Sequence, residues 1–353
     1  MPEFLSDTLS ATVGKGEDSS DHVDIGRLSI DDGISNDDVT SSEDPVETHK
    51  LTTSAIGVDP EKHEHVKEHG RTYHAYNQGK YPLPNDQQEQ NRLNLQHRML
   101  TMLTHGKLYL SPLGDNLQHV LDLATGTAKE HPSATVLGTD LSRIQPQSVP
   151  PNLRFEIKDA EEEWDFEQKF DFIHGRALVT CFTDPSHVVR QAYRSLVPGG
   201  YLEFRDGIMP MEYMEDPPKD CALVKWNEYM VAAGAKAGRP VTNVKNYKRW
   251  MEESGFENVI EETYYLPSNP WPKGQYFKTI SKWFQADMLP SLDGISVKMF
   301  SSLGWSSDQI KTFLDDVRKD FQNPSIHAYL QVKVVYGRKP NQVDDVNGKE
   351  KSS

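Results

Sequence analysis

Residues 119–142, HVLDLATGTAKEHPSATVLGTDLS, decide the fold class of this chain. The stretch holds two short apolar runs, HVLDLA (119–124) and ATVLGTDLS (134–142), and a glycine-containing turn follows the first. Short apolar runs that are bounded by turns are typical of buried strands. The stretch therefore predicts two neighbouring strands of a sheet whose faces are both covered.

The same pattern continues toward the C-terminus. Three further runs predict strands: NLRFEIKDA (152–160), FDFIHGRAL (170–178) and YLEFRD (201–206). Residues 185–196 carry apolar side chains at helical spacing and end at the breaker sequence VPGG. Strands that alternate with helical segments indicate an α/β fold, with a mostly parallel sheet between two layers of helices.

The flanking segments complete the predicted sheet. Asn85 or Asp86 can cap an amphipathic helix that continues past His97. Beyond 206 the chain becomes more helical, with helical insertions expected over about 207–256 and 276–321, and Ser306 or Ser307 capping the last helix. Residues 257–267 and 327–339 predict two closing strands that pair in antiparallel fashion.

Polar residues stand where the predicted strands end. Asp122 and Gly126 follow the first strand, Asp140 the second, Asp159 the third and His174 the fourth. In open α/β sheets, ligands bind beyond the carboxyl ends of the strands. A carboxylate there can accept hydrogen bonds from ribose hydroxyls or from an adenine amino group. The phosphate-binding pattern G-x-G-x-x-G is absent, so the set suits a nucleoside without a pyrophosphate and argues against a nicotinamide dehydrogenase.

With these motifs the sequence resembles the class I S-adenosylmethionine-dependent methyltransferases. The resemblance covers about residues 70–340 and implies a Rossmann-like seven-stranded sheet, mostly parallel with one antiparallel strand near the C-terminus, and helical lid insertions. The flanks resemble the fungal LaeA-like branch, whose members are tied to secondary metabolism. The motifs are VLDLATGT (120–127), VLGTDLS (136–142), IKDAEEEW (157–164), FDFIHGRAL (170–178) and LVPGGYLEF (196–204), and the flanks are YPLPNDQQEQNRLNLQHRML (81–100), KWNEYMVAAGAKAGRP (225–240) and IHAYLQVKVVYGRKP (326–340).

The resemblance implies a role for each strand-end residue toward S-adenosylmethionine. His174 would face the sulfonium and the methyl acceptor, where it is the candidate base. The other residues would bind the cofactor: the methionine part by Asp122 and Gly126, the ribose by Asp140 with Leu141 beside it, and the adenine by Asp159 and Ala160.

Two functions follow from the resemblance, and the sequence leaves both open. The first is methylation of a small secondary metabolite at oxygen, nitrogen or carbon. The second is a methyltransferase-like regulator that acts through protein partners in the nucleus, with weak or no catalysis.

The first glycine loop departs from the family pattern. Residues 125–134 alone connect the first predicted strand to the second, Ala128 stands where a second glycine is expected, and Pro132 restricts any helix there. A parallel crossover with its helix normally needs about 10–12 residues or more. The first helix is therefore expected to be partly lost, either as a genuine variant or through an error in the gene model.

Charge is concentrated at the N-terminus. Residues 1–50 hold 13 Asp or Glu and 3 Lys or Arg, out of a net charge of −15 for all 353 residues. We expect residues 1 to about 60 to be a disordered acidic arm, either a solvated tail or a docking segment for protein partners, and 341–353 to be a disordered tail. The methyltransferase domain then spans 61–340.

The composition excludes several classes of protein. A chain this acidic is unsuited to general binding of nucleic acid, and no apolar run approaches the ~18 residues of a membrane span. The two cysteines, Cys181 and Cys221, and the absence of a secretory signal indicate the cytoplasm or the nucleus. His63, His65 and His69 lack the spacing of a metal site, so we expect no metal.

Two groups of residues keep alternative interpretations. Arg176 and Arg205 either anchor an acidic acceptor or pair with Glu203 and Asp206. The aromatic residues of the helical second half either shape an apolar acceptor pocket or only pack the helices together; they are Trp226, Tyr229, Tyr247, Trp250, Trp271, Tyr276, Trp283 and Trp305.

Overall fold

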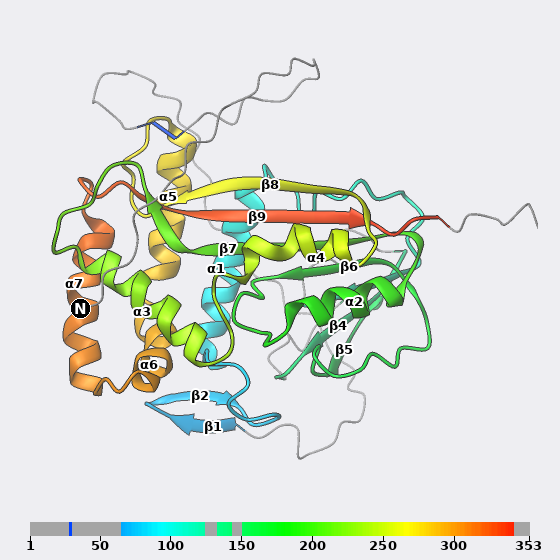
Figure 1. Cartoon of the computed structure of the whole chain (residues 1–353), viewed down its shortest axis with the longest axis horizontal. Coiled ribbons are helices and arrows are strands. Elements are labelled where there is room, and N and C mark those ends of the chain that lie inside the picture. Colours follow the sequence, from blue (N-terminus) through cyan, green and yellow to red (C-terminus); the bar gives the residue numbers. More distant parts are fainter. Residues whose placement is uncertain (1–27, 30–64, 124–132, 143–149, 342–353) are drawn as a thin grey trace, which may run out of the picture.

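The computed structural model describes residues 28–29, 65–123, 133–142 and 150–341 (Figure 1). Gly126 and nearly all of the predicted acidic arm and C-terminal tail lie outside the described residues, so the predictions made for them stay predictions. In the part that is described, no helix has both the length and the apolar character needed to cross a membrane.

The core of the molecule is a seven-stranded sheet. β9 is antiparallel to both of its neighbours, and the remaining strands run parallel to one another. This arrangement confirms the predicted α/β sheet with its one antiparallel strand near the C-terminus. The strands lie in the spatial order β5 (Leu153–Ile157), β4 (Thr135–Asp140), β3 (His119–Asp122), β6 (Phe170–Arg176), β7 (Leu196–Tyr213), β9 (Ala328–Arg338) and β8 (Glu257–Pro267).

Helices flank the sheet and extend it at one end. The predicted caps are confirmed: the Asp86 side chain accepts from the backbone N–H of Glu89, and Ser306 forms a capping box with Gln309. The helices are α1 (Gln87–Leu103), α2 (Pro185–Ser195), α3 (Ala222–Lys236), the 3-10 helix η2 (Asn243–Asn246), α4 (Tyr247–Glu253), α5 (Gln275–Met288), α6 (Leu292–Ser302) and α7 (Ser307–Gln322).

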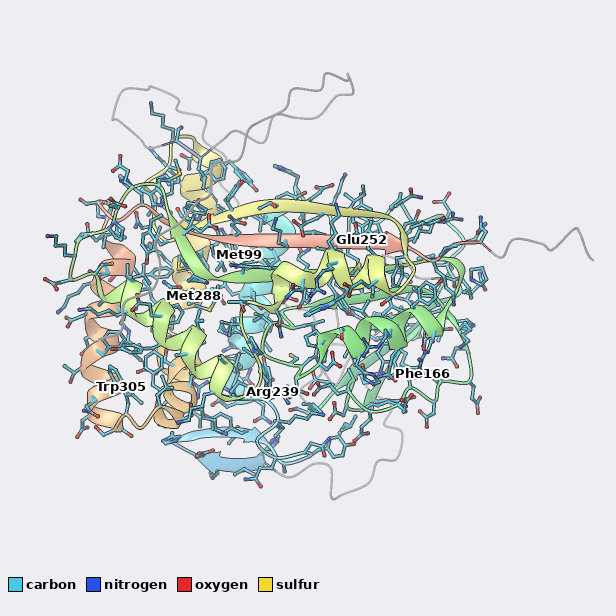
Figure 2. All side chains as sticks on the ribbon, in the orientation of Figure 1. Met99, Phe166, Arg239, Glu252, Met288 and Trp305 are labelled. Carbon is cyan, nitrogen blue, oxygen red and sulfur yellow. The ribbon has the colours of Figure 1, made fainter. Side chains whose placement is uncertain are left out.

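The helices divide into two groups. Helices α2 and α4 pack on one face of the sheet, where Val188 and Met251 are fully buried in the same cluster as Phe204. Helices α3, α5, α6 and α7 gather beyond the end of the sheet toward which β7 runs, and α1 contacts α5 (Figure 1). Figure 2 shows Met99 and Met288 on this helical side of the molecule and Phe166 on the side of α2. The carboxyl ends of the parallel strands therefore face the helical group.

Two regions differ from the sequence-based expectation. Residues 207–213, expected to begin a helical insertion, continue strand β7, because the long strand β9 pairs with them from Gly207↔Val332 to Tyr213↔Ala328. Pro210 within this stretch interrupts the apolar alternation that marks a strand. The antiparallel hairpin of β1 (His65–Glu68) and β2 (Arg71–His74) was not expected, since its residues are polar.

The connection between β3 and β4 is short, and the register explains why the two strands still pair in parallel. Asp122 lies opposite Gly138, and His119 lies opposite Thr135. The chain between Asp122 and Thr135 therefore has to return by only the length of β3, about 10 Å at the usual rise of a strand. Residues 124–132 of this connection lie outside the described residues, so the expected partial loss of the first helix stays a prediction.

One segment of the N-terminal arm is described, and it contacts the helical group. Leu28 is 9% exposed and belongs to the same buried cluster as Trp271 and Ile280. The carbonyl oxygen of Ser29 accepts a hydrogen bond of 2.8 Å from the backbone N–H of Lys273.

Candidate active site

The carboxyl ends of β3 and β6 bring Asp122 and His174 together. They are direct neighbours in the register, and their side chains are 1% and 3% exposed. His174 Nδ1 lies 3.2 Å from Asp122 Oδ1. With the carboxylate ionised, Nδ1 carries the proton and Nε2 of the neutral ring is left as an acceptor. Nε2 is buried and has no hydrogen-bond partner in the described part of the chain.

The end of β4 presents Asp140. Its Oδ1 accepts a 2.7 Å hydrogen bond from the backbone N–H of Ser142, and the carboxylate keeps some exposure to solvent. Loss of water around the carboxylate raises the pKa of Asp140 to about 6, although the backbone N–H groups of Ser142 and Leu141 stabilise the ionised form. Asp140 is thus an acceptor whose charge changes close to neutral pH.

Asp159, beyond β5, is held by residues that the sequence analysis missed. Its Oδ2 accepts a 2.8 Å hydrogen bond from Asn77 and also pairs with Lys80, while its Oδ1 accepts from the backbone N–H of Glu161. The neighbouring Ala160 contributes its carbonyl oxygen to the indole N–H of Trp164. The segment before α1 therefore crosses the end of β5, where the adenine was predicted.

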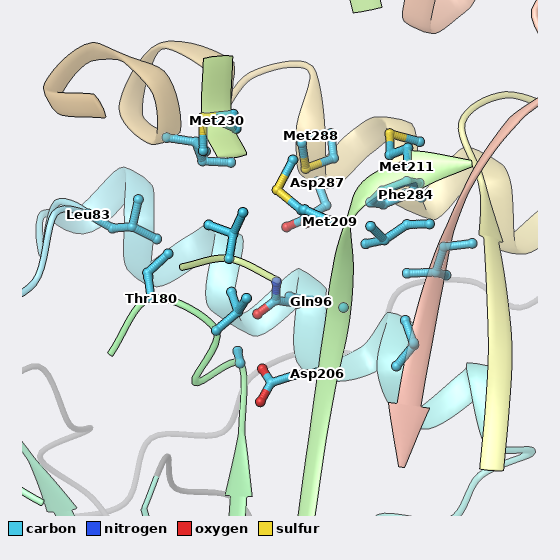
Figure 3. Close-up of a pocket in the computed structure, with 18 of the residues that line it drawn as sticks. Leu83, Gln96, Thr180, Asp206, Met209, Met211, Met230, Phe284, Asp287 and Met288 are labelled. Atoms are coloured by element: carbon cyan, nitrogen blue, oxygen red, sulfur yellow. The ribbon is translucent and has the colours of Figure 1, made fainter. Parts of the chain in front are cut away.

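An apolar cavity is lined by the sheet and by helices α1, α3, α5 and α6 (Figure 3), and none of the predicted site residues Asp122, Asp140, Asp159 and His174 lines it. It has a volume of about 170 Å³, and its wall on the sheet side begins at Ala177, which follows β6 directly and has a φ of 57°. Trp226 and Phe284 contribute aromatic surface. Unbranched thioether side chains adapt to ligands of irregular shape. Six methionines line the cavity: Met99, Met209, Met211, Met230, Met288 and Met299.

Asp206 borders the cavity at the sheet end. Its Oδ1 accepts a 2.6 Å hydrogen bond from the backbone N–H of Leu178, and its Oδ2 accepts one of 2.8 Å from the hydroxyl of Tyr247. Burial raises the pKa of Asp206 to about 7. The contacts fix the turn that contains Ala177, so Asp206 shapes the cavity wall.

The two arginines of the strand ends are engaged within the protein. Arg176 Nη2 lies 3.0 Å from His97 Nδ1, and burial lowers the pKa of Arg176 to about 10. Arg205 is fully buried and lies 3.7 Å from Glu203, which supports the pairing interpretation for this residue. Arg205 also lines the cavity.

The helical second half does form a cavity wall, but only part of the aromatic set contributes to it. Trp226 lines the cavity, whereas Tyr229 and Trp305 pack edge to face with each other at a ring distance of 5.0 Å. Tyr247 acts on the cavity through Asp206. Both interpretations of the aromatic residues therefore apply, each to different side chains.

Comparisons with known proteins identify the class. Residues 95–261 match the family model described as a methyltransferase domain. Methyltransferase pytC of Aspergillus terreus is 32% identical over 283 residues, which are 77% of this chain and 87% of pytC. Probable methyltransferase tdiE of Emericella nidulans is 35% identical over 261 residues, 71% of this chain and 82% of tdiE. The secondary metabolism regulator laeA of Aspergillus flavus is 31% identical over 293 residues, 79% of each chain.

The chain belongs to this methyltransferase family, which confirms the predicted class of enzyme and, with it, S-adenosylmethionine as the cofactor. Its relatives carry names of both predicted kinds, methyltransferases and a regulator of secondary metabolism. Among solved structures, the phosphoethanolamine N-methyltransferase 2 of Haemonchus contortus aligns at a TM-score of 0.39 and 16% identity, over 71% of this chain and 53% of that one.

The described strand-end residues fit an adenosyl cofactor by their chemistry. Asp140 is a partly exposed acceptor, and the buried Nε2 of His174 lacks a partner among the described residues. Asp159 has less free hydrogen-bonding capacity for the cofactor, because Lys80 and Asn77 already bind one of its oxygens. No group of three or more metal-ligating side chains occurs within the described ranges.

Proposed function

We propose that this chain methylates a small apolar secondary metabolite at an oxygen, nitrogen or carbon atom. The observation that carries the proposal is the methionine-lined cavity that starts at Ala177, directly after β6, and continues along β7; Asp122 and His174 do not themselves line it. A methyltransferase must hold its acceptor beside the cofactor and exclude water. An apolar cavity at this position suits an acceptor with little charge.

S-adenosylmethionine, when bound, supplies the electrophilic methyl group. The proposed cofactor residues are those at the strand ends: Asp140 and Leu141 for the ribose, Asp122 and Gly126 for the methionine part, and Asp159 and Ala160 for the adenine. A carboxylate oxygen has two lone-pair sites, so Asp159 can accept a further hydrogen bond beside Lys80 and Asn77.

His174 is the proposed proton acceptor for acceptors that lose a proton. Asp122 orients the imidazole through Nδ1, so Nε2 is available as the basic atom. The cavity wall at Ala177 follows shortly after His174 along the same strand. His174 does not line the cavity, so the proposal requires the reacting atom of the acceptor to lie at the end of the cavity that Ala177 borders.

Binding of S-adenosylmethionine tests the proposal directly. In a thermal-shift titration, millimolar cofactor should raise the melting temperature of the wild-type chain, and Asp140→Ala should abolish the shift because the ribose loses its acceptor. Asp115→Ala, on an exposed residue before β3, is the matched control and should keep the full shift. A wild-type melting temperature that does not respond to the cofactor would contradict the proposed enzyme.

A second candidate function is regulation of secondary metabolism through protein partners, in the nucleus or the cytoplasm. The specific observation in its favour is the engagement of Asp159 by Lys80 and Asn77, which covers the adenine end of the site. The acidic arm, anchored at Leu28, is the proposed partner-binding segment. Replacement of the gene by one that encodes Asp140→Ala separates the two: a regulator keeps its effect on metabolite production, and an enzyme loses it.

A further inference from the structure

The acceptor cavity is largely apolar and has a polar corner between α1 and α5, in addition to Arg205 and Asp206 on its sheet side. Gln96 of α1 and Asp287 of α5 line the corner (Figure 3), and so does Arg92 of α1. The Asp287 side chain is 1% exposed, so its carboxylate has been removed from bulk water. A buried carboxylate is expected to have hydrogen-bond partners for both oxygens.

The positive charge in this corner is already neutralised. Arg92 Nε and Nη2 donate to Glu89 Oε1 at 2.9 and 2.7 Å, and Arg92 Nη1 donates to Asp287 Oδ1 at 3.4 Å. One guanidinium thus faces two carboxylates, and the buried group of three carries a net negative charge when all are ionised. Asp206 adds another carboxyl group on the sheet side of the same cavity.

The second oxygen of Asp287 is the group that the protein leaves open. Within the described part of the chain, Asp287 Oδ2 accepts no hydrogen bond, and the side-chain amide of Gln96 makes none either. Asp287 lines the cavity, so a donor supplied by a ligand can form the hydrogen bond that this oxygen does not make within the protein. The polar corner is therefore built to recognise a hydrogen-bond donor.

We infer that the cavity takes an apolar acceptor that donates a hydrogen bond from N–H or O–H to Asp287 and carries no anionic group. The inference rests on the proposed function for the statement that the cavity is the acceptor site, and it adds the chemical class of the acceptor. A carboxylate or phosphate in this corner would meet the ionised Asp287, with Arg92 already paired to two carboxylates, so it would be repelled. Gln96 is the adaptable second partner, since its amide can donate or accept.

The protonation state agrees with this assignment. Burial raises the pKa of Asp287 to about 6, against the opposing effect of Arg92 and with a contribution from Glu89. At neutral pH the carboxyl group is therefore mostly ionised and can only accept. If Asp287 served only to hold Arg92 in place, the protein would bind ligands with and without a hydrogen-bond donor equally well.

Three naphthalene probes of similar size test the inference by calorimetry on the full chain at pH 7.5. The wild-type protein should bind 2-naphthol, which has an O–H donor, about tenfold more tightly than 2-methoxynaphthalene, which has none. The anionic 2-naphthoate should bind more weakly still. Equal affinities for the three probes, or no binding of 2-naphthol at millimolar concentration, would overturn the inference.

Asp287→Asn is the decisive variant. The amide oxygen can keep the contact with Arg92, so the amide nitrogen takes the place of Oδ2 and presents a donor to the cavity. The preference for 2-naphthol should disappear, while Asp316→Asn on the exposed face of α7 should keep it. If Asp287→Asn still bound 2-naphthol more tightly than 2-methoxynaphthalene, another residue would recognise the donor, and the role proposed for Asp287 would be overturned.

A second variant and the cofactor titration distinguish donor recognition by the polar corner from methyl transfer itself. If Asp287→Asn does not fold, Gln96→Leu provides the test, because Gln96 has no hydrogen bond to lose, and the preference should fall about threefold. An unchanged preference in Gln96→Leu would then count against the polar corner. A cofactor shift without probe selectivity would refute only the inference, whereas probe selectivity without a cofactor shift would refute only the proposed methyl transfer.

Discussion

The two halves of the candidate site are built in opposite ways. The cofactor half consists of polar side chains that follow consecutive strands, such as Asp122, Asp140 and His174. The acceptor half is a largely apolar cavity whose charged groups come from elements far apart in the chain: Arg92 from α1, Asp287 from α5, and Arg205 and Asp206 from β7. The cofactor half can therefore be recognised from short motifs, whereas the acceptor half exists only after the helices have packed.

The largest expected effect comes from Arg205, a fully buried residue of the cavity wall. Arg205 lines the cavity and also donates from Nη1 and Nη2 to the carbonyl oxygens of Leu100 and Leu108 at 3.2 and 2.9 Å. Arg205→Met should lower the free energy of unfolding by about 3–5 kcal/mol, because it leaves buried acceptors and Glu203 without their partner. Chemical denaturation measures the loss.

The exposed Arg249, paired with Glu253 one turn along α4, is the matched control for that experiment. Arg249→Met should change the free energy of unfolding by about 0.5 kcal/mol or less. Similar losses in the two variants would show that the buried contacts of Arg205 stabilise the fold no more than an exposed ion pair does.

The strand-end pair was predictable because its geometry is local. The apolar runs at 119–124 and 170–178 show where each strand lies and where it ends. Parallel neighbours end at the same edge of the sheet. Asp122 and His174 then had to meet, and they lie directly opposite each other. The adjacent Asp140 follows from the same reasoning on β4.

The contacts that the sequence did not predict all depend on long-range packing. Asp159 is bound by Asn77 and Lys80, which are about 80 residues away in a polar segment without a strand or helix motif. Arg92 and Asp287 are separated by 195 residues and meet only because α1 packs on α5. Periodicity identifies the face of a helix but not its partner, so the polar corner of the cavity was invisible in the sequence.

A smaller effect should separate catalysis from binding within the cofactor half. His174→Gln should reduce kcat for methyl transfer by about 10²–10³-fold, because glutamine cannot accept the proton, with a change in cofactor affinity of about threefold or less. The assay is methyl transfer to an acceptor selected by the probe measurements. His187→Gln on α2, which packs on the face of the sheet, is the control and should keep full activity. An equal loss of kcat and of cofactor affinity would make His174 a binding residue instead.

The smallest effect tests whether the two carboxylates with raised pKa values belong to different halves. Asp140 and Asp287 both have a pKa of about 6, but only Asp140 is proposed to bind the cofactor. The ionised carboxylate accepts the ribose hydroxyls, so cofactor affinity should be constant well above pH 6 and fall as the pH drops below the pKa of the free protein. At pH 5 it should be about tenfold weaker than at pH 8, since only about a tenth of Asp140 is then ionised. Calorimetric titration of S-adenosylmethionine across this range gives the profile.

The two isosteric variants decide which carboxylate is responsible for that profile. Asp140→Asn should flatten the pH dependence of cofactor binding, because the amide does not titrate, whereas Asp287→Asn should leave the profile unchanged. The reverse result would mean that protonation in the acceptor cavity is coupled to the cofactor and that the halves do not act separately. Asp206 has a pKa of about 7 and accepts a hydrogen bond from the backbone N–H of Leu178, in the turn after β6. If neither variant flattens the pH profile of cofactor binding, Asp206 is the carboxyl group to which we would assign it.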